Sequence, residues 1–368
     1  MTQLPTFALR LSALRAQFGQ AAAPAIAAAL QQMSLSRAVL LATPGHADQA
    51  HDMAAQIGPS VVAVLPVAQM HTPVEVTQHA LPQVLAAKAD ALISLGGGSV
   101  TGLGKALALH THLPHIAVPT THAGSEVTGI LGQTEAGRKT TVSDPRLQPQ
   151  VVIYDPRLIA SLPAQITVTS ALNALAHAVE ALYAPDRNPL TSSLALQGAQ
   201  ALITAVPKVL ENLNNLEARA DCQYGGFLCG LVLGQVGMGL HHKLCHTLGG
   251  SFGLPHAQTH AVILPHAVAY NEAAVPDLLA PLARILNAPN AGQGLYALAQ
   301  SLHAPQSLRA LGLAEADLDR AADLATQAPY PNPNPLEKPA LRALLQAAWE
   351  GPSPKTQRLS WLTSPPRF

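Results

Sequence analysis

An α/β domain built on a parallel sheet, followed by an all-helical domain, is the fold class that the sequence predicts. Over about the first 160 residues, short apolar runs rich in β-branched residues alternate with helical patterns. Such alternation is typical of a parallel sheet covered by helices. After Asp155 and Pro156 the strand signal fades, and Ala- and Leu-rich segments with a 3.6-residue period follow. We therefore assign residues 1–158 to the α/β domain and residues 159–368 to the helical domain.

Individual elements follow from the same patterns. Five buried strands are expected at residues 37–42, 61–66, 91–95, 115–118 and 151–154. Helices are expected at residues 170–183, 194–213 and 340–349. Residues 328–339 are dense in Pro and Asn, which predicts a non-helical excursion before the last of these helices.

Composition excludes several classes of protein. With 48% apolar residues in 368, the chain can bury a large core, and its 21 basic and 21 acidic residues give no overall attraction to nucleic acid or anionic membrane. We find neither a signal peptide nor a run of about 18 apolar residues. Three cysteines, an odd number, are expected to be reduced thiols. These features indicate a cytoplasmic enzyme with a small-molecule substrate.

A glycine triplet marks the first candidate binding site. Gly96, Gly97, Gly98 and Ser99 follow an expected strand and precede a helix that begins near Val100. Glycines let backbone N–H groups approach a ligand, and a helix N-terminus favours a pyrophosphate. The spacing is not GxGxxG and does not follow the first strand, so tight packing of the turn is an equally good explanation.

Hydroxyl side chains near two other strand ends are further cofactor candidates. Thr120, Thr121 and Ser125 follow the next strand and could donate to the nicotinamide or ribose, although such residues often only cap helices. Thr43 follows the strand at 37–42. No acidic residue stands beside it to select NAD over NADP, so we expect NADH or NADPH to serve.

Polar residues in the second half form a candidate catalytic cluster. Asn173 and His177 lie four apart, on one face of an otherwise apolar helix. Residues 239–266 then hold six histidines and a lysine, namely His241, His242, Lys243, His246, His256, His260 and His266. One histidine alone is more often a satisfied core residue, but this density favours a site. His260 and His266 could still serve only to hydrogen-bond loops.

The motifs GGGSVTGLGKA, PTTHAGSE, NALAHAVEALY, HHKLCHTLGG and LPH occur in this order. Together they resemble the iron-containing alcohol dehydrogenases over nearly the whole chain. Within that superfamily, MHTPVEV, KTTVSDPR, VVIYDP, GLHHKLCH and LPHAQTHAVILPHAVAYN resemble the maleylacetate reductases. The resemblance implies a dehydroquinate synthase-like fold, in which a Rossmann-like dinucleotide-binding domain and a helical catalytic domain enclose a cleft. It also implies a homodimer.

The resemblance further implies the reaction. In metal-dependent relatives an Asp and three His hold iron or zinc, and these positions match Asn173, His177, His242 and His256. The acidic ligand is missing, and an amide is a poorer ligand for a divalent ion. The resemblance thus implies reduction of maleylacetate, or a close enone, to 3-oxoadipate by NADH or NADPH without a metal, in aromatic-compound catabolism. A metal-dependent alcohol dehydrogenase and a non-catalytic nucleotide-binding protein are the alternatives.

Without a metal, protein cations must stabilise the charge that develops on the ketone oxygen. Lys139, Lys243, His242 and His246 are the candidates. His246 matches a catalytic position of the metal-dependent relatives, so it is the first candidate for the acid. His177 and His256 would shape the pocket or bind a carboxylate. Lys139 could instead be a solvated turn residue, and Lys243 could point outward.

Four positions depart from the maleylacetate reductase pattern: His122 replaces a Tyr, Ser143 an Arg, Gln258 a Glu, and Asn334 stands where NPRP is expected. Two of these changes remove arginines. If those arginines contact a dicarboxylate, this chain could act on a smaller or less anionic enone, aldehyde or ketone.

Overall fold

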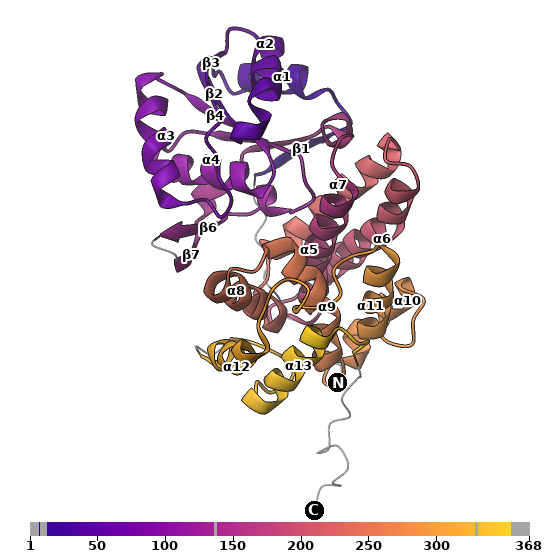
Figure 1. The fold of residues 1–368 in the computed structure, drawn as a ribbon. Coiled ribbons are helices and arrows are strands. Elements are labelled where there is room, and N and C mark those ends of the chain that lie inside the picture. The colour runs from indigo at the N-terminus through magenta and orange to yellow at the C-terminus, as the bar shows by residue number, and fades with distance from the viewer. Residues whose placement is uncertain (1–6, 8–12, 136–137, 328–329, 355–368) are drawn as a thin grey trace, which may run out of the picture.

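A parallel sheet and a helical bundle form the two halves of the molecule (Figure 1). The computed structural model describes residues 7, 13–135, 138–327 and 330–354. Its six-stranded sheet has the order β1-β8-β5-β4-β2-β3, and every neighbouring pair is parallel. The strands are β1 (Arg15–Phe18), β2 (Ala38–Leu41), β3 (Val61–Leu65), β4 (Ala91–Gly96), β5 (His115–Pro119) and β8 (Val151–Tyr154).

The five expected strands are confirmed as β2, β3, β4, β5 and β8. Three strands were missed. β1 is short, carries Arg15 and Gln17, and lies at the sheet edge beside β8, so it has no continuous apolar run. β6 (Ile130–Glu135) and β7 (Arg138–Ser143) form a separate antiparallel hairpin whose residues are mostly polar.

Helices cover both faces of the sheet. This explains why the sequences of its central strands are unbroken apolar runs. Along β2, Ala38 and Leu40 face a core that includes α1 (Ala22–Gln32) and α2 (Ala47–Ile57). Val39 and Leu41 face the opposite core, which includes α3 (Val74–Ala86) and α4 (Gly98–Thr111). The alternation along one strand is that expected of a pleated sheet.

The strand order reverses beside β2. β3 pairs with one side of β2, and the chain then crosses to the other side, where β4 pairs with β2 and β5 with β4. In open parallel sheets, ligands bind outside the carboxyl ends of strands at such a switch point. Thr43 lies beyond β2, and Gly96–Gly98 join the end of β4 to the start of α4, so the predicted cofactor loops lie there.

The helical half is built around α5 (Ala164–Tyr183), which is buried from Thr167 onward and contacts α6, α7 and α9. Its other helices are α6 (Pro189–Glu211), α7 (Leu216–Leu233), α8 (Leu240–Phe252), α9 (His256–Glu272), α10 (Pro276–Ile285), α11 (Ala291–Ser301), α12 (Leu318–Thr326) and α13 (Lys338–Glu350). α6 begins five residues before the predicted start, because Asn188 and Thr191 form a capping box at Pro189. Among the described residues, no helix is long and apolar enough to span a membrane. The domain boundary at residue 158 stays a prediction.

Candidate active site

The two halves meet along α7, α8 and the hairpin. α7 packs against η2 (Ser125–Val127), and β7 packs against α8 (Figure 1). The contact with α7 depends on glycine, because a Cβ on Gly230 would lie only 2.2 Å from the carbonyl oxygen of Gly124. The loop that carries Thr120, Thr121 and Ser125 is therefore held directly against the helical half.

The glycine loop and the loop after β5 touch each other at the edge of the sheet. A Cβ on Gly97 would lie 2.9 Å from Thr121 Cγ2, and the Thr120 N–H donates to the carbonyl of Gly96 at 3.1 Å. α4 begins at Gly98, with Ser99 in its first turn. The buried Ser125 Oγ has no hydrogen-bond partner among the described residues. Unpaired helix N–H groups and this hydroxyl suit a dinucleotide.

Thr43 lies two residues beyond the end of β2, which is the neighbouring strand of β4 in the sheet. Its Oγ1 is 2.8 Å from His46 Nδ1, and no acidic side chain follows β2 as far as His46. An acidic residue near this position commonly binds the adenosine ribose of NAD. The loop therefore offers no such carboxylate to select NAD.

A buried polar centre lies against the segment that follows β5. The ammonium group of Lys105 donates to the carbonyls of Ser125 and Ile130 and to Thr128 Oγ1, at 2.6, 2.8 and 3.1 Å. Burial lowers the pKa of Lys105 to about 7, against a raising effect of Glu126. Glu126 accepts the Tyr154 hydroxyl at 2.7 Å, and burial raises the pKa of this carboxyl group. Sequence analysis did not identify this centre.

One face of α5 supplies the helical half of the site. Asn173, His177 and Glu180 follow one another at intervals of four and three residues, and all three are buried. Sequence analysis identified the first two and missed Glu180. A carboxylate three residues after His177 on an apolar helix was the signal that could have found it.

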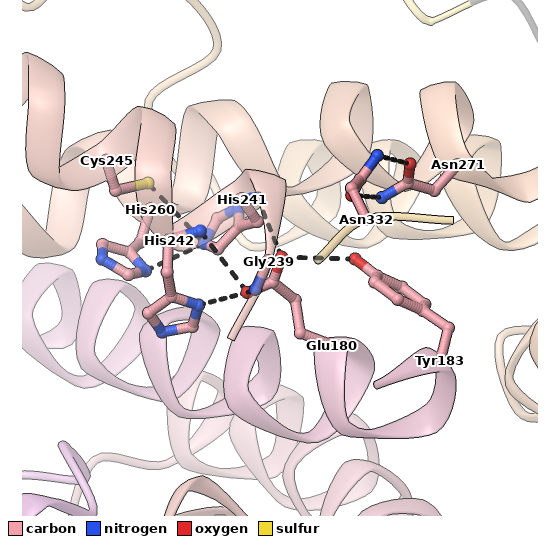
Figure 2. Close-up of polar contacts among 9 residues, drawn as sticks. All are labelled: Glu180, Tyr183, Gly239, His241, His242, Cys245, His260, Asn271 and Asn332. Carbon is pink, nitrogen blue, oxygen red and sulfur yellow. Dashed lines mark hydrogen bonds and ion pairs between the residues drawn. The ribbon is translucent and has the colours of Figure 1, made fainter. Parts of the chain in front are cut away.

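Glu180 organises the start of α8. Its carboxylate accepts the backbone N–H groups of Gly239 and His241 at 3.1 and 2.8 Å, and its Oε2 lies 2.5 Å from His242 Nδ1 (Figure 2). A carboxylate at a helix N-terminus is stabilised by the helix dipole. Because the carboxylate accepts, Nδ1 of His242 carries the proton. The Nε2 atom of His242 is buried and has no partner among the described residues.

The histidines of α5, α8 and α9 pack ring against ring. His177 stacks on His242 with ring centroids 5.1 Å apart, and His246 stacks on His256 at 6.1 Å. His241 Nε2 lies 2.9 Å from His260 Nδ1, so His260 belongs to the cluster. His246 is exposed and His256 half-buried, whereas the others are buried. The cluster thus has a buried interior and an accessible side at His246.

Three buried members of the cluster, His177, His241 and His260, are neutral bases. Burial lowers the pKa values of His177, His241 and His260 well below the usual histidine value, and the neighbouring histidines lower them further. These three side chains therefore cannot supply positive charge near neutral pH. Any cation for the reaction must come from another histidine of the cluster or from lysine.

The two candidate lysines are placed differently. Lys243 is half-buried on α8, and its ammonium donates to the Gln327 carbonyl at 3.0 Å and lies 5.8 Å from the centre of the Tyr330 ring. In this structure Lys243 connects α8 to the segment around Gln327. Its catalytic role stays a prediction. Lys139 lies on β7 opposite Thr134, but its side chain lies outside the described part of the structure.

The four departures fall into two groups. Asn334 is buried and donates to the Tyr270 carbonyl at 2.8 Å, while the buried His122 has a pKa lowered by burial to about 4. These two residues are structural elements here. Ser143 is exposed at the end of β7, and Gln258 is half-buried on α9. Neither the hydroxyl of Ser143 nor the amide of Asn334 carries the charge of the arginine expected at its position.

The residues at the relatives' metal positions do not fit a metal ion well. Asn173 brings a neutral amide whose buried Oδ1 has no partner among the described residues. Within the described ranges, His177, His242 and His256 do not bring three ligand atoms within 4.8 Å of one another, whereas His241, Cys245 and His260 do. We derive no reaction step through a metal.

Comparisons with known proteins cover nearly the whole chain. Residues 14–156 match the family described as iron-containing alcohol dehydrogenase, and residues 167–349 match its C-terminal domain family. The maleylacetate reductase of a Rhizobium species is 55% identical over 93% of this chain and 97% of its own length. That of Burkholderia cepacia is 47% identical over 92% and 97%. A crystal structure of maleylacetate reductase from Agrobacterium tumefaciens superposes with a TM-score of 0.93 at 52% identity, covering 95% of this chain and all of that one.

Proposed function

The chain belongs to the iron-containing alcohol dehydrogenase family, and we propose that it is a nicotinamide-dependent reductase that converts maleylacetate to 3-oxoadipate. One observation carries the proposal, namely 55% identity over 93% of the chain to a protein named maleylacetate reductase. The site agrees with it, since the loops at the switch point suit a dinucleotide and the histidine cluster lies on the helical half. Such a protein is an oxidoreductase.

We propose that the two loops at the sheet edge bind different parts of the cofactor. Gly96, Gly97, Gly98 and Ser99 would receive the pyrophosphate, and Thr120, Thr121 and Ser125 the nicotinamide side. Either NADH or NADPH would serve, because no acidic residue follows Thr43. When bound, the cofactor supplies a hydride to the alkene carbon remote from the ketone. Negative charge then develops on the ketone oxygen of the substrate.

His246 is the residue that we assign as acid. It is the accessible member of the cluster, and its ring centroid lies 6.1 Å from that of His242. His246 would deliver a proton to the carbon beside the ketone and so complete the reduction. His242, fixed by Glu180, and Lys139 would stabilise the enolate charge.

The remaining residues of the cluster shape the pocket. Asn173 offers a neutral amide, and the pKa of His177 is lowered by burial, so this side chain acts as a neutral hydrogen-bonding group. His256 stacks on His246 and would orient it. Lys243, tied to Gln327, would keep the segment around residue 330 against α8.

We propose that hydride transfer needs no metal. The neutral Asn173 stands where the metal-dependent relatives have an acidic ligand, and the matching histidines do not converge. We further propose a cytoplasmic homodimer. This rests on the resemblance and on three buried thiols without disulfides.

An assay of NADH and NADPH oxidation with freshly generated maleylacetate tests the proposal. We expect oxidation of at least one cofactor and 3-oxoadipate in equal amount. Oxidation with simple aldehydes but not with maleylacetate would identify an alcohol dehydrogenase. Cofactor binding without turnover on any of these substrates would identify a non-catalytic protein.

A further inference from the structure

Behind His242, three buried side chains of α8 and α9 converge on one point (Figure 2). We propose that His241, Cys245 and His260 bind one thiophilic metal ion, Zn²⁺ or Cu⁺, at a site separate from the reaction. Their ligand atoms all lie within 4.8 Å of one another. His241 and Cys245 are four apart on α8, so they share a helix face, and His260 comes from α9.

One hydrogen bond from His241 Nε2 cannot serve both of its neighbours. His241 Nε2 lies 2.9 Å from His260 Nδ1 and 3.7 Å from Cys245 Sγ. An imidazole nitrogen has one in-plane lone pair or one proton, so it bonds well to only one of the two neighbours. An ion at the centre would accept electron pairs from all three atoms at once.

Two of the three distances between ligand atoms are close to those that an ion requires. Zinc binds histidine nitrogen at about 2.0–2.1 Å and thiolate sulfur at about 2.3 Å, which places tetrahedral N···N and N···S pairs roughly 3.3 and 3.6 Å apart. The 3.7 Å pair already has this separation. The 2.9 Å pair would open by only about half an ångström, through small rotations of the rings.

The donor set and its surroundings define the class of ion. Two imidazoles and one thiolate favour soft ions such as Zn²⁺ and Cu⁺ over Mg²⁺ or Ca²⁺. His241, Cys245 and His260 are each 0% exposed, so neither substrate nor cofactor can reach the ion. We therefore assign it a structural role, in which it joins α8 to α9 and stabilises the fold.

This set is distinct from the ligand positions of metal-dependent relatives. Those positions match Asn173, His177, His242 and His256, and they share no residue with the proposed site. A metal ion found in the purified protein therefore has two candidate locations. The assignment does not depend on the substrate, since an ion at His241 takes no part in hydride transfer.

Metal content of three variants separates the two locations. The full-length protein is produced in medium supplemented with zinc or, in a second culture, with copper, because the buried site must load during folding. We expect about one ion per chain in the wild-type protein from at least one medium. Cys245→Ala should lose it, whereas His177→Ala and Cys229→Ala should keep it. Cys229 is the matched control, since it is a buried thiol on α7 outside the cluster.

X-ray absorption at the metal edge gives a readout independent of activity. Two nitrogen ligands and one sulfur ligand are expected, and the ion should raise the Tm of the wild-type protein but not that of Cys245→Ala. Retention of the ion by Cys245→Ala and its loss from His177→Ala would place it at the relatives' position and overturn the proposal. If protein from neither medium contains bound metal, the three side chains are only hydrogen-bonded to one another, and the proposal is equally overturned.

Discussion

The buried polar centres of the two halves differ in how completely their atoms are paired. Beneath the cofactor loops, Lys105 donates three hydrogen bonds, and Glu126 accepts the Tyr154 hydroxyl. In the helical half, ring nitrogens of His177, His241, His242 and His260 have no partner among the described residues. Leaving a buried polar atom unpaired costs about 1–3 kcal/mol. We therefore expect the hydrogen-bonded centre around Lys105 to stabilise the fold. We expect the histidine cluster, whose ring nitrogens lack partners, to bind a ligand.

Glu180 contributes both to the stability of the fold and to the candidate site. It stabilises the fold through the N-terminus of α8, and it also fixes the ring of His242 through Nδ1. The comparison predicts that substitutions near Lys105 act on stability, whereas substitutions in the histidine cluster act on turnover.

The largest effect is expected at His246. His246→Ala should lower kcat at least ~100-fold with a small change in the KM for NADH, because it removes the proposed acid and leaves the cofactor loops intact. The measurement is steady-state NADH oxidation with maleylacetate. His110→Ala, an exposed histidine on α4, is the control and should keep wild-type kcat. An unchanged kcat in His246→Ala would remove this residue from the mechanism.

Removing the charge of Glu180 is expected to have the next largest effect. Glu180→Gln should lower kcat/KM about 10–100-fold, as is typical when a residue that orients a functional histidine is changed. Glu272 is a matched control, since its buried carboxylate accepts the N–H groups of Ala291 and Gly292 without contacting the cluster. Glu272→Gln should lower the free energy of unfolding and keep kcat/KM. Equal kcat/KM losses in both variants would show that Glu180 acts only through stability.

Much of this arrangement could be predicted from the sequence. Unbroken apolar runs located the central strands, because strands covered on both faces contain few polar residues. Intervals of four residues located Asn173 with His177 and His242 with His246. β1 escaped detection because pairing with the distant β8, not local composition, makes it a strand. The hairpin escaped detection because its residues are mostly polar.

Other parts of the site depend on contacts between elements that no local pattern records. Glu180 contacts Gly239 and His241, about 60 residues later, and Lys105 contacts Ile130 across a strand. The sequence left open whether His260 belongs to the cluster or only hydrogen-bonds a loop, and in the structure it faces His241 on another helix. The hydrogen bond between Lys243 and the Gln327 carbonyl likewise joins distant parts of the chain and could not be predicted from local sequence.

Gly230→Ala tests the contact between the halves. Its Cβ would lie 2.2 Å from the backbone oxygen of Gly124, so the loop carrying Ser125 must shift. We expect the Kd for NADH to rise about tenfold or more, since displacements of about 1 Å at a site can have such effects. Gly234→Ala is the control, because its nearest contact would be at 3.6 Å. Equal NADH affinity in both variants would contradict the role of this contact.

The smallest expected effects are on how the free energy of unfolding depends on pH. The two centres should affect it over different pH ranges. Burial lowers the pKa of Lys105 from 10.5 to about 7, so the unfolded state binds more protons between these values and stability should rise with pH there. The pKa values of His177, His241 and His260 are lowered below 6.5, so stability should fall as pH drops below 6.5. Urea unfolding across pH measures both slopes. Lys105→Met should flatten only the alkaline slope, and a flattened acid slope would contradict this assignment.

Turnover measured against bound metal tests the central claim most directly. Preparations of the wild-type protein that differ in zinc, copper and iron content are assayed for NADH oxidation with maleylacetate, before and after treatment with a chelator. We predict the same kcat per chain at every metal content, because histidines and lysine stabilise the enolate. A kcat that rises in proportion to bound metal and is restored by adding it back would contradict the account.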